Sequence, residues 1–245
     1  GSRTQIGGPT GAFVVVVAGI VAQHGVQGLF ICTFLAGVFL VLLGATGMGT
    51  AVNYIPRPVV VGFTNGIAVL IASTQLRDFF GLRVGHASGA FLPRLTQLWG
   101  VRSTFSSEAL LLGLASLAIV ILIPRLLARV PGAIVALVGG TVACAALGLT
   151  VDTIGTRFGG IPSGFPRFAV PPMTLHLIPP LISPALTVAM LGAIESLMSA
   201  VVADRMTGDR HDPNTELVAQ GIANIASPLV GGLPATGAIA RTATN

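Results

Sequence analysis

Two charged side chains mark the chemistry of this chain, because both lie in or beside apolar stretches. Glu195 is in the middle of the apolar run 177–203, and Arg241 follows the run 217–230 within a segment of small residues. Ionisable groups at membrane depth are costly and are functional candidates by default. An arginine suits recognition of an anion, and a carboxylate near it suits binding of a proton or a metal cation.

The segments that must position these groups are short and interrupted by glycine and proline. Residues 7–12 (GGPTGA) are echoed by residues 231–238 (GGLPATGA) near the other end of the chain. Such a pair in corresponding places is typical of transporters built from repeats. The apolar run 12–22 has about half of the roughly 20 residues that a spanning helix needs. We interpret it as a half-helix; a short span with a glycine-rich lead-in is the alternative.

The rest of the chain alternates apolar runs with polar connections. The other runs are 28–48, 59–73, 109–123, 132–150, 177–203 and 217–230. With the half-helix and the Arg241 segment they predict eight spans. An offset of seven spans reverses direction, so the two broken segments would enter the membrane from opposite sides, as an inverted repeat requires.

The connections are predicted to be loops. Residues 82–107 form the longest one, with Trp99 suited to the membrane interface. Residues 152–172 form a loop that separates two groups of helices. Asn214 is predicted to start a helix with an acidic first turn. His86 and His211 are interpreted as loop and turn residues.

Composition excludes several classes of function. Charged residues make up 9% of the chain and hydrophobic residues 53%, which indicates an integral membrane protein. The thirteen basic residues are all arginine, so a P-loop lysine and a Schiff-base lysine are excluded. The arginines are scattered, which argues against nucleic acid as a partner. Without a His/Cys cluster or a Gly-x-Ser-x-Gly motif, we expect no enzyme, metal or cofactor.

Together these features predict a site for a small anion. Two opposed half-helices would direct their N-termini, each with a partial positive charge, at one place. Arg241 would add a full charge, and protonation of Glu195 would remove its repulsion of the anion. Sodium bound by Glu195 with Ser196 or Ser199 is the competing role. A buried pair in which Glu195 and Arg241 neutralise each other is the structural alternative.

Six motifs, in order along essentially the whole chain, resemble the SulP family of anion transporters, which is related to the animal SLC26 proteins. They are QIGGPTGAF (5–13), YIPRPVVVGF (54–63), GGIPSGFP (159–166), AIESL (193–197), VADRMTGD (202–209) and GLPATGAIARTATN (232–245). The combination is highly specific.

The resemblance implies an all-α membrane protein with part of a 7+7 inverted-repeat, UraA/SLC26-like fold. Its two half-helices would each follow a short strand, the second at 237–239. Residues 1–50 and 177–245 would belong to the core (transport) domain, and residues 51–176 to the gate domain. The chain resembles helices three to ten, without the other helices or the cytoplasmic STAS domain, so this piece is not expected to transport alone. The full-length protein would be a homodimer in the cell (plasma or inner) membrane.

The resemblance also implies which residues form the site. The anion would lie between Pro9, Thr10 and Gly11 on one side and the start of the second half-helix on the other. That second group is Ile239, Ala240, Arg241 and Thr242. Glu195 matches the acidic position linked to the coupling ion, proton or Na⁺, and Ser199 matches a cation-binding hydroxyl in some relatives.

The implied function is secondary active transport of a small inorganic or carboxylate anion by an elevator mechanism. Sulfate with proton symport is the first expectation, and bicarbonate or a dicarboxylate comes next. Na⁺-coupled bicarbonate transport and anion exchange are the alternatives. A nucleobase permease of the same fold and a non-transporting, voltage-responsive scaffold rank lower.

Overall fold

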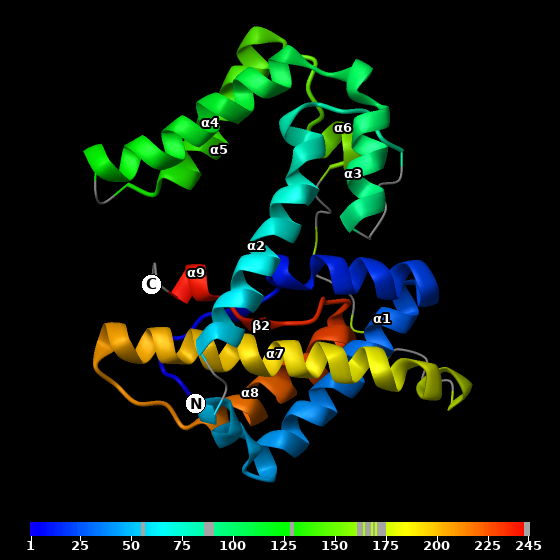
Figure 1. Cartoon of the computed structure of the whole chain (residues 1–245), viewed down its shortest axis with the longest axis vertical. Helices are drawn as coiled ribbons and strands as arrows, with labels where there is room; N and C mark the ends of the chain where they lie inside the picture. Colours follow the sequence, from blue (N-terminus) through cyan, green and yellow to red (C-terminus); the bar gives the residue numbers. More distant parts are fainter. Residues whose placement is uncertain are drawn as a thin grey trace. The chain divides into compact units, whose positions relative to one another are not determined.

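The computed structural model describes residues 1–54, 57–85, 91–127, 130–160, 164, 168, 170 and 175–242, and most of them are helical (Figure 1). The chain forms two compact units. Unit 1 comprises Gly1–Ile67 and Phe165–Asn245, and unit 2 comprises Ala68–Gly164. The helix α2 (Arg57–Phe79) contributes residues to both units.

Unit 1 contains the two short strands and most of the long helices. Its remaining elements are β1 (Gly7–Gly8), η1 (Gly11–Phe13), α1 (Val14–Ala45), η2 (Met48–Tyr54), η4 (Leu175–Leu177), α7 (Ile178–Thr207), α8 (Pro213–Ala226), η5 (Ser227–Val230), β2 (Thr236–Gly237) and α9 (Ile239–Thr242). The helix α1 is interrupted at Gly25, where φ is 69° and ψ is −178°. A glycine adopts this conformation without a steric penalty. The break confirms the predicted short helical segment ahead of a full span.

The helices α1 and α8 pack backbone to backbone along a seam of glycines. A Cβ atom built on Gly37 would lie 2.7 Å from Gly221 O, and one on Gly221 would lie 2.7 Å from Gly37 O. Two turns further along α1, a Cβ on Gly44 would lie 2.6 Å from Asn214 O. Real side chains do not tolerate such distances, so glycine is required here. Small residues that bring backbones together are the usual contact between helices in membranes.

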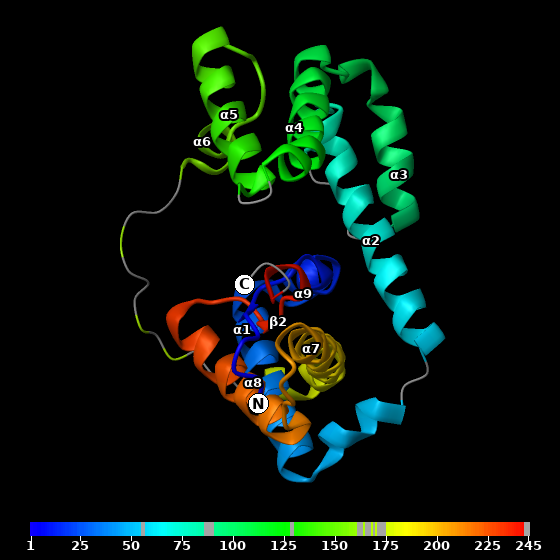
Figure 2. The ribbon, with the colours of Figure 1, turned by 90° about the vertical axis from the view of Figure 1, so that its left-hand side faces the viewer.

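The hydrophobic core of unit 1 lies between α1 and α7, and Figure 2 views α7 nearly end on. It is built from aliphatic and small side chains, including Leu29, Ile31, Cys32, Ala36 and Leu40 of α1 and Leu181, Ala185, Val188, Ala189, Ala193 and Leu197 of α7. Alanines at helical spacing let α7 approach its neighbours closely. Within the described residues, three segments are long and apolar enough to cross a membrane: Gly11–Ala45, Ser107–Leu126 and Ile178–Thr207.

In unit 2, the prediction that 82–107 forms one loop is wrong. The unit contains α3 (Phe91–Gly100), η3 (Arg102–Thr104), α4 (Ser107–Leu126), α5 (Gly132–Leu147) and α6 (Ile154–Phe158). In α3, apolar residues at a helical spacing bury Leu98 on one face. Arg94 on this helix is only 6% exposed, and its Nη1 donates to Ser73 Oγ at 2.9 Å. His86 lies outside the described residues.

Two further predictions are corrected in detail. The loop 152–172 contains α6, which starts with a capping box between Thr153 and Thr156. The N-cap of α8 is Asp212 rather than Asn214, because Asp212 Oδ1 accepts from the N–H groups of Asn214 and Thr215 at 2.8 and 2.9 Å. These two bonds hold the pKa of Asp212 below its usual range, and the bond from Thr215 N has the larger effect.

The glycine seam gives a prediction about stability. Replacing Gly221 with alanine places a methyl group against the backbone of α1, so the helices must separate, at a cost of about 1–3 kcal/mol. We expect a lower thermal midpoint for the purified full-length protein, measured by fluorescence-detected size exclusion. Gly19→Ala in α1 is the matched control, since no atom lies within 4 Å of a Cβ at that residue. Equal midpoints for the two variants would contradict the seam.

Candidate functional site

The site is built where the two ends of the chain pair as a short antiparallel ladder. Gly7 is opposite Gly237, and Gly8 is opposite Thr236. The pairing continues at Ala238, whose N–H donates to Ile6 O at 2.8 Å. Because the ladder is antiparallel, the helical segments that follow the two strands leave it in opposite directions.

The predicted half-helices, each after a short strand, are therefore confirmed, but the register differs slightly. We predicted the second strand at 237–239, whereas β2 is Thr236–Gly237 and α9 begins at Ile239. The reason is that Thr242 N donates to Ala238 O at 2.8 Å and closes the first helical turn. Ile239 is thus already helical.

Arg241 lies on α9 and reaches across to the β1–η1 connection. Its Nη2 donates to Pro9 O at 3.3 Å. A Cβ atom on Gly8 would lie 2.8 Å from its Nη1, so the guanidinium lies directly over this glycine. The structure thus brings Arg241 together with the predicted Pro9, which directly precedes Thr10 and Gly11 in the chain.

Glu195 approaches the same connection from α7. It is 7% exposed, and Thr10 Oγ1 donates to its Oε2 at 3.0 Å. Thr10 is the N-cap of η1, but its side chain makes no capping hydrogen bond in the described structure. Its hydroxyl serves the carboxylate instead. Arg241 and Glu195 therefore each have a partner on the residues 9–10.

Ser196 holds β2 against α7. Its Oγ accepts from Gly237 N at 2.9 Å and lies 3.1 Å from Thr236 Oγ1. Thr236 Oγ1 donates to Gly192 O at 3.1 Å. Since a hydroxyl has one hydrogen, Ser196 is the donor to Thr236. Both side chains are fully buried, and Thr236 was not predicted from the sequence.

Ser199, the predicted cation-binding hydroxyl, is one helical turn from Glu195 and is fully buried. Its Oγ lies 2.9 Å from Thr242 Oγ1, which also accepts from Ile6 N at 3.2 Å. Thr242 therefore ties α7, α9 and the segment before β1 together. Among the predicted site residues, Ala240 is the one whose side chain is not described.

Gly237 makes the closest approach between β2 and α7. A Cβ atom there would lie 2.8 Å from Ser196 Cα and from Ser199 Cβ, and it would overlap Gln5 Nε2. The amide of Gln5 therefore occupies the space that a larger residue would fill. Both polar atoms of this amide are shielded from solvent and have no hydrogen-bond partner within the described part of the chain.

The other buried polar residues near the ladder come from α8. Glu216, Gln220 and Asn224 are four residues apart and form one stripe, which is buried. Glu216 accepts from Ser2 N at 2.8 Å, and Asn224 pairs with the backbone of Ala235. The four-residue spacing within an apolar helix is a signal that the sequence does contain and that we did not use.

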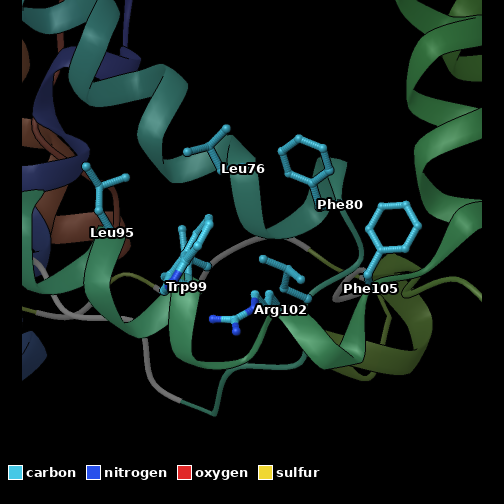
Figure 3. Close-up of a pocket in the computed structure, with 8 residues that line it drawn as sticks. Leu76, Phe80, Leu95, Trp99, Arg102 and Phe105 are labelled. Atoms are coloured by element: carbon cyan, nitrogen blue, oxygen red, sulfur yellow. The ribbon is translucent and has the colours of Figure 1, made fainter.

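Unit 2 contains a pocket of about 420 Å³, which is lined by none of these residues (Figure 3). Its lining is apolar except for Arg102, whose guanidinium carbon lies 5.0 Å from the centre of the Trp99 ring. No predicted site residue lines it. Across the described ranges, His, Cys, Asp and Glu side chains form no group of three that could hold a metal ion.

Comparison with known proteins gives consistent results. The profile of the Sulfate permease family matches residues 1–245. A Bacillus subtilis (strain 168) protein named "Putative sulfate transporter YvdB" is 47% identical over 246 residues, which cover 100% of this chain and 46% of that protein. The bicarbonate transporter BicA of a Picosynechococcus species is 31% identical over 255 residues, covering 100% of this chain and 45% of BicA.

A solved structure of the transmembrane domain of a cyanobacterium bicarbonate transporter BicA has the same fold. The TM-score is 0.85 at 32% identity, with 99% of this chain and 63% of that chain covered. The predicted UraA/SLC26-like fold is therefore confirmed. The chain spans about half the length of the curated relatives it matches. On this evidence the chain belongs to the sulfate permease family, the SulP family whose motifs it shares.

Proposed function

We propose that this chain is part of a secondary active transporter that carries a small anion across a membrane. The observation that carries the proposal is the place of Arg241, whose guanidinium lies over Gly8 and bonds Pro9 O at the junction of the two strands. A guanidinium binds an oxyanion through two parallel hydrogen bonds, and it keeps its charge at every physiological pH. The names of the relatives, sulfate and bicarbonate transporters, support the same class of substrate.

Sulfate is the substrate that we propose first. The family description and the name of the relative at 47% identity both support it. Bicarbonate is the second candidate, supported by the likeness to BicA. Both are oxyanions that a guanidinium can bind in the bidentate manner, so competition for uptake decides between them.

Proton symport is the proposed coupling, with Glu195 as the proton acceptor. The carboxylate is one hydrogen bond from Thr10, next to the proposed anion position. When ionised it repels an anion, and when protonated it does not, so a proton and an anion favour each other's binding. The Na⁺-coupled alternative uses Glu195 with Ser199, which is one turn away on α7.

An elevator movement of the core domain against the gate domain is the proposed mechanism. We assign 1–50 and 177–245 to the core and 51–176 to the gate. Unit 1 contains all of the assigned core, with Arg241, Glu195 and both strands, and also residues 51–67 and 165–176 of the assigned gate. Its compactness supports a site that moves as one body. Homodimerisation and a place in the cell membrane belong to the same proposal for the full-length protein.

Removal of the guanidinium tests the anion site. Arg241→Ala should lower kcat/KM for radiolabelled sulfate uptake by about 10- to 100-fold, the value of one charge-assisted hydrogen bond. The assay uses the full-length protein in proteoliposomes with an inward proton gradient. Arg205→Ala, an exposed arginine in the last turn of α7, is the matched control and should transport as the wild type does.

Other substrates are tested in the same vesicles. Bicarbonate, dicarboxylates and nucleobases are added as competitors. No sulfate uptake by a demonstrably folded wild type would remove sulfate as the substrate. Wild-type uptake by Arg241→Ala would remove the anion site at this residue.

Neutralisation of Glu195 tests the coupling. Glu195→Gln keeps the shape and an acceptor for Thr10 but cannot bind and release a proton, so uptake should lose its stimulation by the proton gradient. The measurement is initial uptake with and without the gradient. Glu108→Gln in unit 2, whose carboxylate accepts from Thr150 N at 2.7 Å, should keep the stimulation.

The alternatives predict different results in this assay. Stimulation of the wild type by a sodium gradient alone would favour Na⁺ coupling. Uptake that requires an anion inside the vesicle would favour exchange. Charge movement without net flux would favour the voltage-responsive scaffold, and stimulated uptake by Glu195→Gln would contradict proton coupling through this residue.

A further inference from the structure

Asn224 is the buried side chain that connects α8 to the chain just before β2. It is 1% exposed and lies in the last turn of the helix. Its Nδ2 donates to Ala235 O at 2.8 Å, and its Oδ1 accepts from Ala235 N at 2.9 Å. The amide thus pairs with both backbone groups of Ala235, in the manner of a neighbouring strand.

Four consecutive residues of this segment are held by three different partners. Ala235 is held by Asn224 of α8, and Ala238 is held by Ile6 O. Thr236 and Gly237, between them, are held by α7 through Gly192 O and Ser196 Oγ. The segment 235–238 leads directly into α9, which carries Arg241.

Both N–H donors of Asn224 are taken up by the protein. Besides its bond to Ala235 O, the Nδ2 donates to Gln220 O at 2.9 Å. A side-chain amide has two N–H donors, so none is left for an anion. Asn224 can therefore influence an anion only through the backbone that it holds.

We propose that Asn224 is a positioning residue, which fixes the backbone at Ala235 and thereby the place of Arg241 relative to the β1–η1 connection. This inference rests on the proposed anion transport, because Arg241 is the proposed anion ligand. The amide supplies an acceptor and a donor at a fixed separation, and it matches the N–H and C=O of one residue. A hydroxyl carries its donor and its acceptor on one atom, and an aliphatic side chain offers neither.

The first test compares two asparagines of the same helix in the full-length protein. Asn224→Ala should raise the KM for sulfate uptake about tenfold, because the guanidinium is no longer held in place, with kcat changed less than KM. Asn214→Ala is the matched control. It also removes a side-chain bond to backbone, from Gly49 N at 2.9 Å, but far from β2 along the helix. It should leave the KM unchanged.

The second test uses the nearly isosteric Asn224→Asp. An ionised carboxylate there has no hydrogen to donate and faces the oxygens of Ala235 and Gln220, whereas a protonated carboxyl restores one donor. The ratio of its KM to that of the wild type should therefore fall toward one as the pH is lowered from about 8 to about 5. A general loss of packing would give a ratio that does not depend on pH.

A third measurement does not require transport. Hydrogen exchange in the peptide 232–240 should be faster in Asn224→Ala than in the wild type and in Asn214→Ala. If the wild type takes up no anion but Asn224→Ala accelerates exchange in this peptide, the proposed transport function fails. The role of Asn224 in fixing the backbone at Ala235 is then still supported. If uptake is normal and Asn224→Ala has the KM and the exchange of the wild type, the positioning role is overturned.

Discussion

The pairing of β1 with β2 is the constraint on which the rest of the site depends. It joins residues from opposite ends of the chain, and it fixes where both half-helices begin. A ladder of two residues in each strand is too short to be stable alone. It exists because hydroxyl and amide groups of α7 and α8, with Thr242, hold its edges. The polar side chains inside these helices therefore have a structural task as well as the proposed chemical one.

Glycine makes this arrangement possible at two levels. Along α1 and α8 it lets two helix backbones approach within the distance that a methyl group would occupy, and at Gly237 it lets a strand lie against α7. In a membrane, where burial of apolar surface drives helix association only weakly, such close contact and the hydrogen bonds beside it supply the attraction. Glu195 and Arg241 are brought to the same connection by helices that are themselves packed in this way.

Much of this arrangement could be predicted from the sequence, and each part that could not be predicted has a physical reason. The glycine and proline breaks at the two ends, the half-helix before Gly25 and the presence of Glu195 and Arg241 in or beside apolar stretches are local patterns. The helix α3 was missed because its apolar residues are mixed with arginine, proline and glutamine, which resembles a loop composition. The pairing of Asn224 with Ala235 depends on which backbone lies opposite the helix, and spacing alone does not contain that information. The start of α9 at Ile239 depends likewise on a single turn-closing bond.

The wide separation of the paired segments also has a consequence for biosynthesis. Arg241 and Pro9 are 232 residues apart in the chain. At the usual rate of translation, the first segment waits roughly ten to fifty seconds before its partner leaves the ribosome. At the end of that interval α7 and α8 are complete, but Ser196 and Asn224 still lack their partners Gly237 and Ala235, which follow in the chain. We expect this nascent state to depend on protection by the insertion machinery, so that variants which slow the final closure also lower the yield of folded protein.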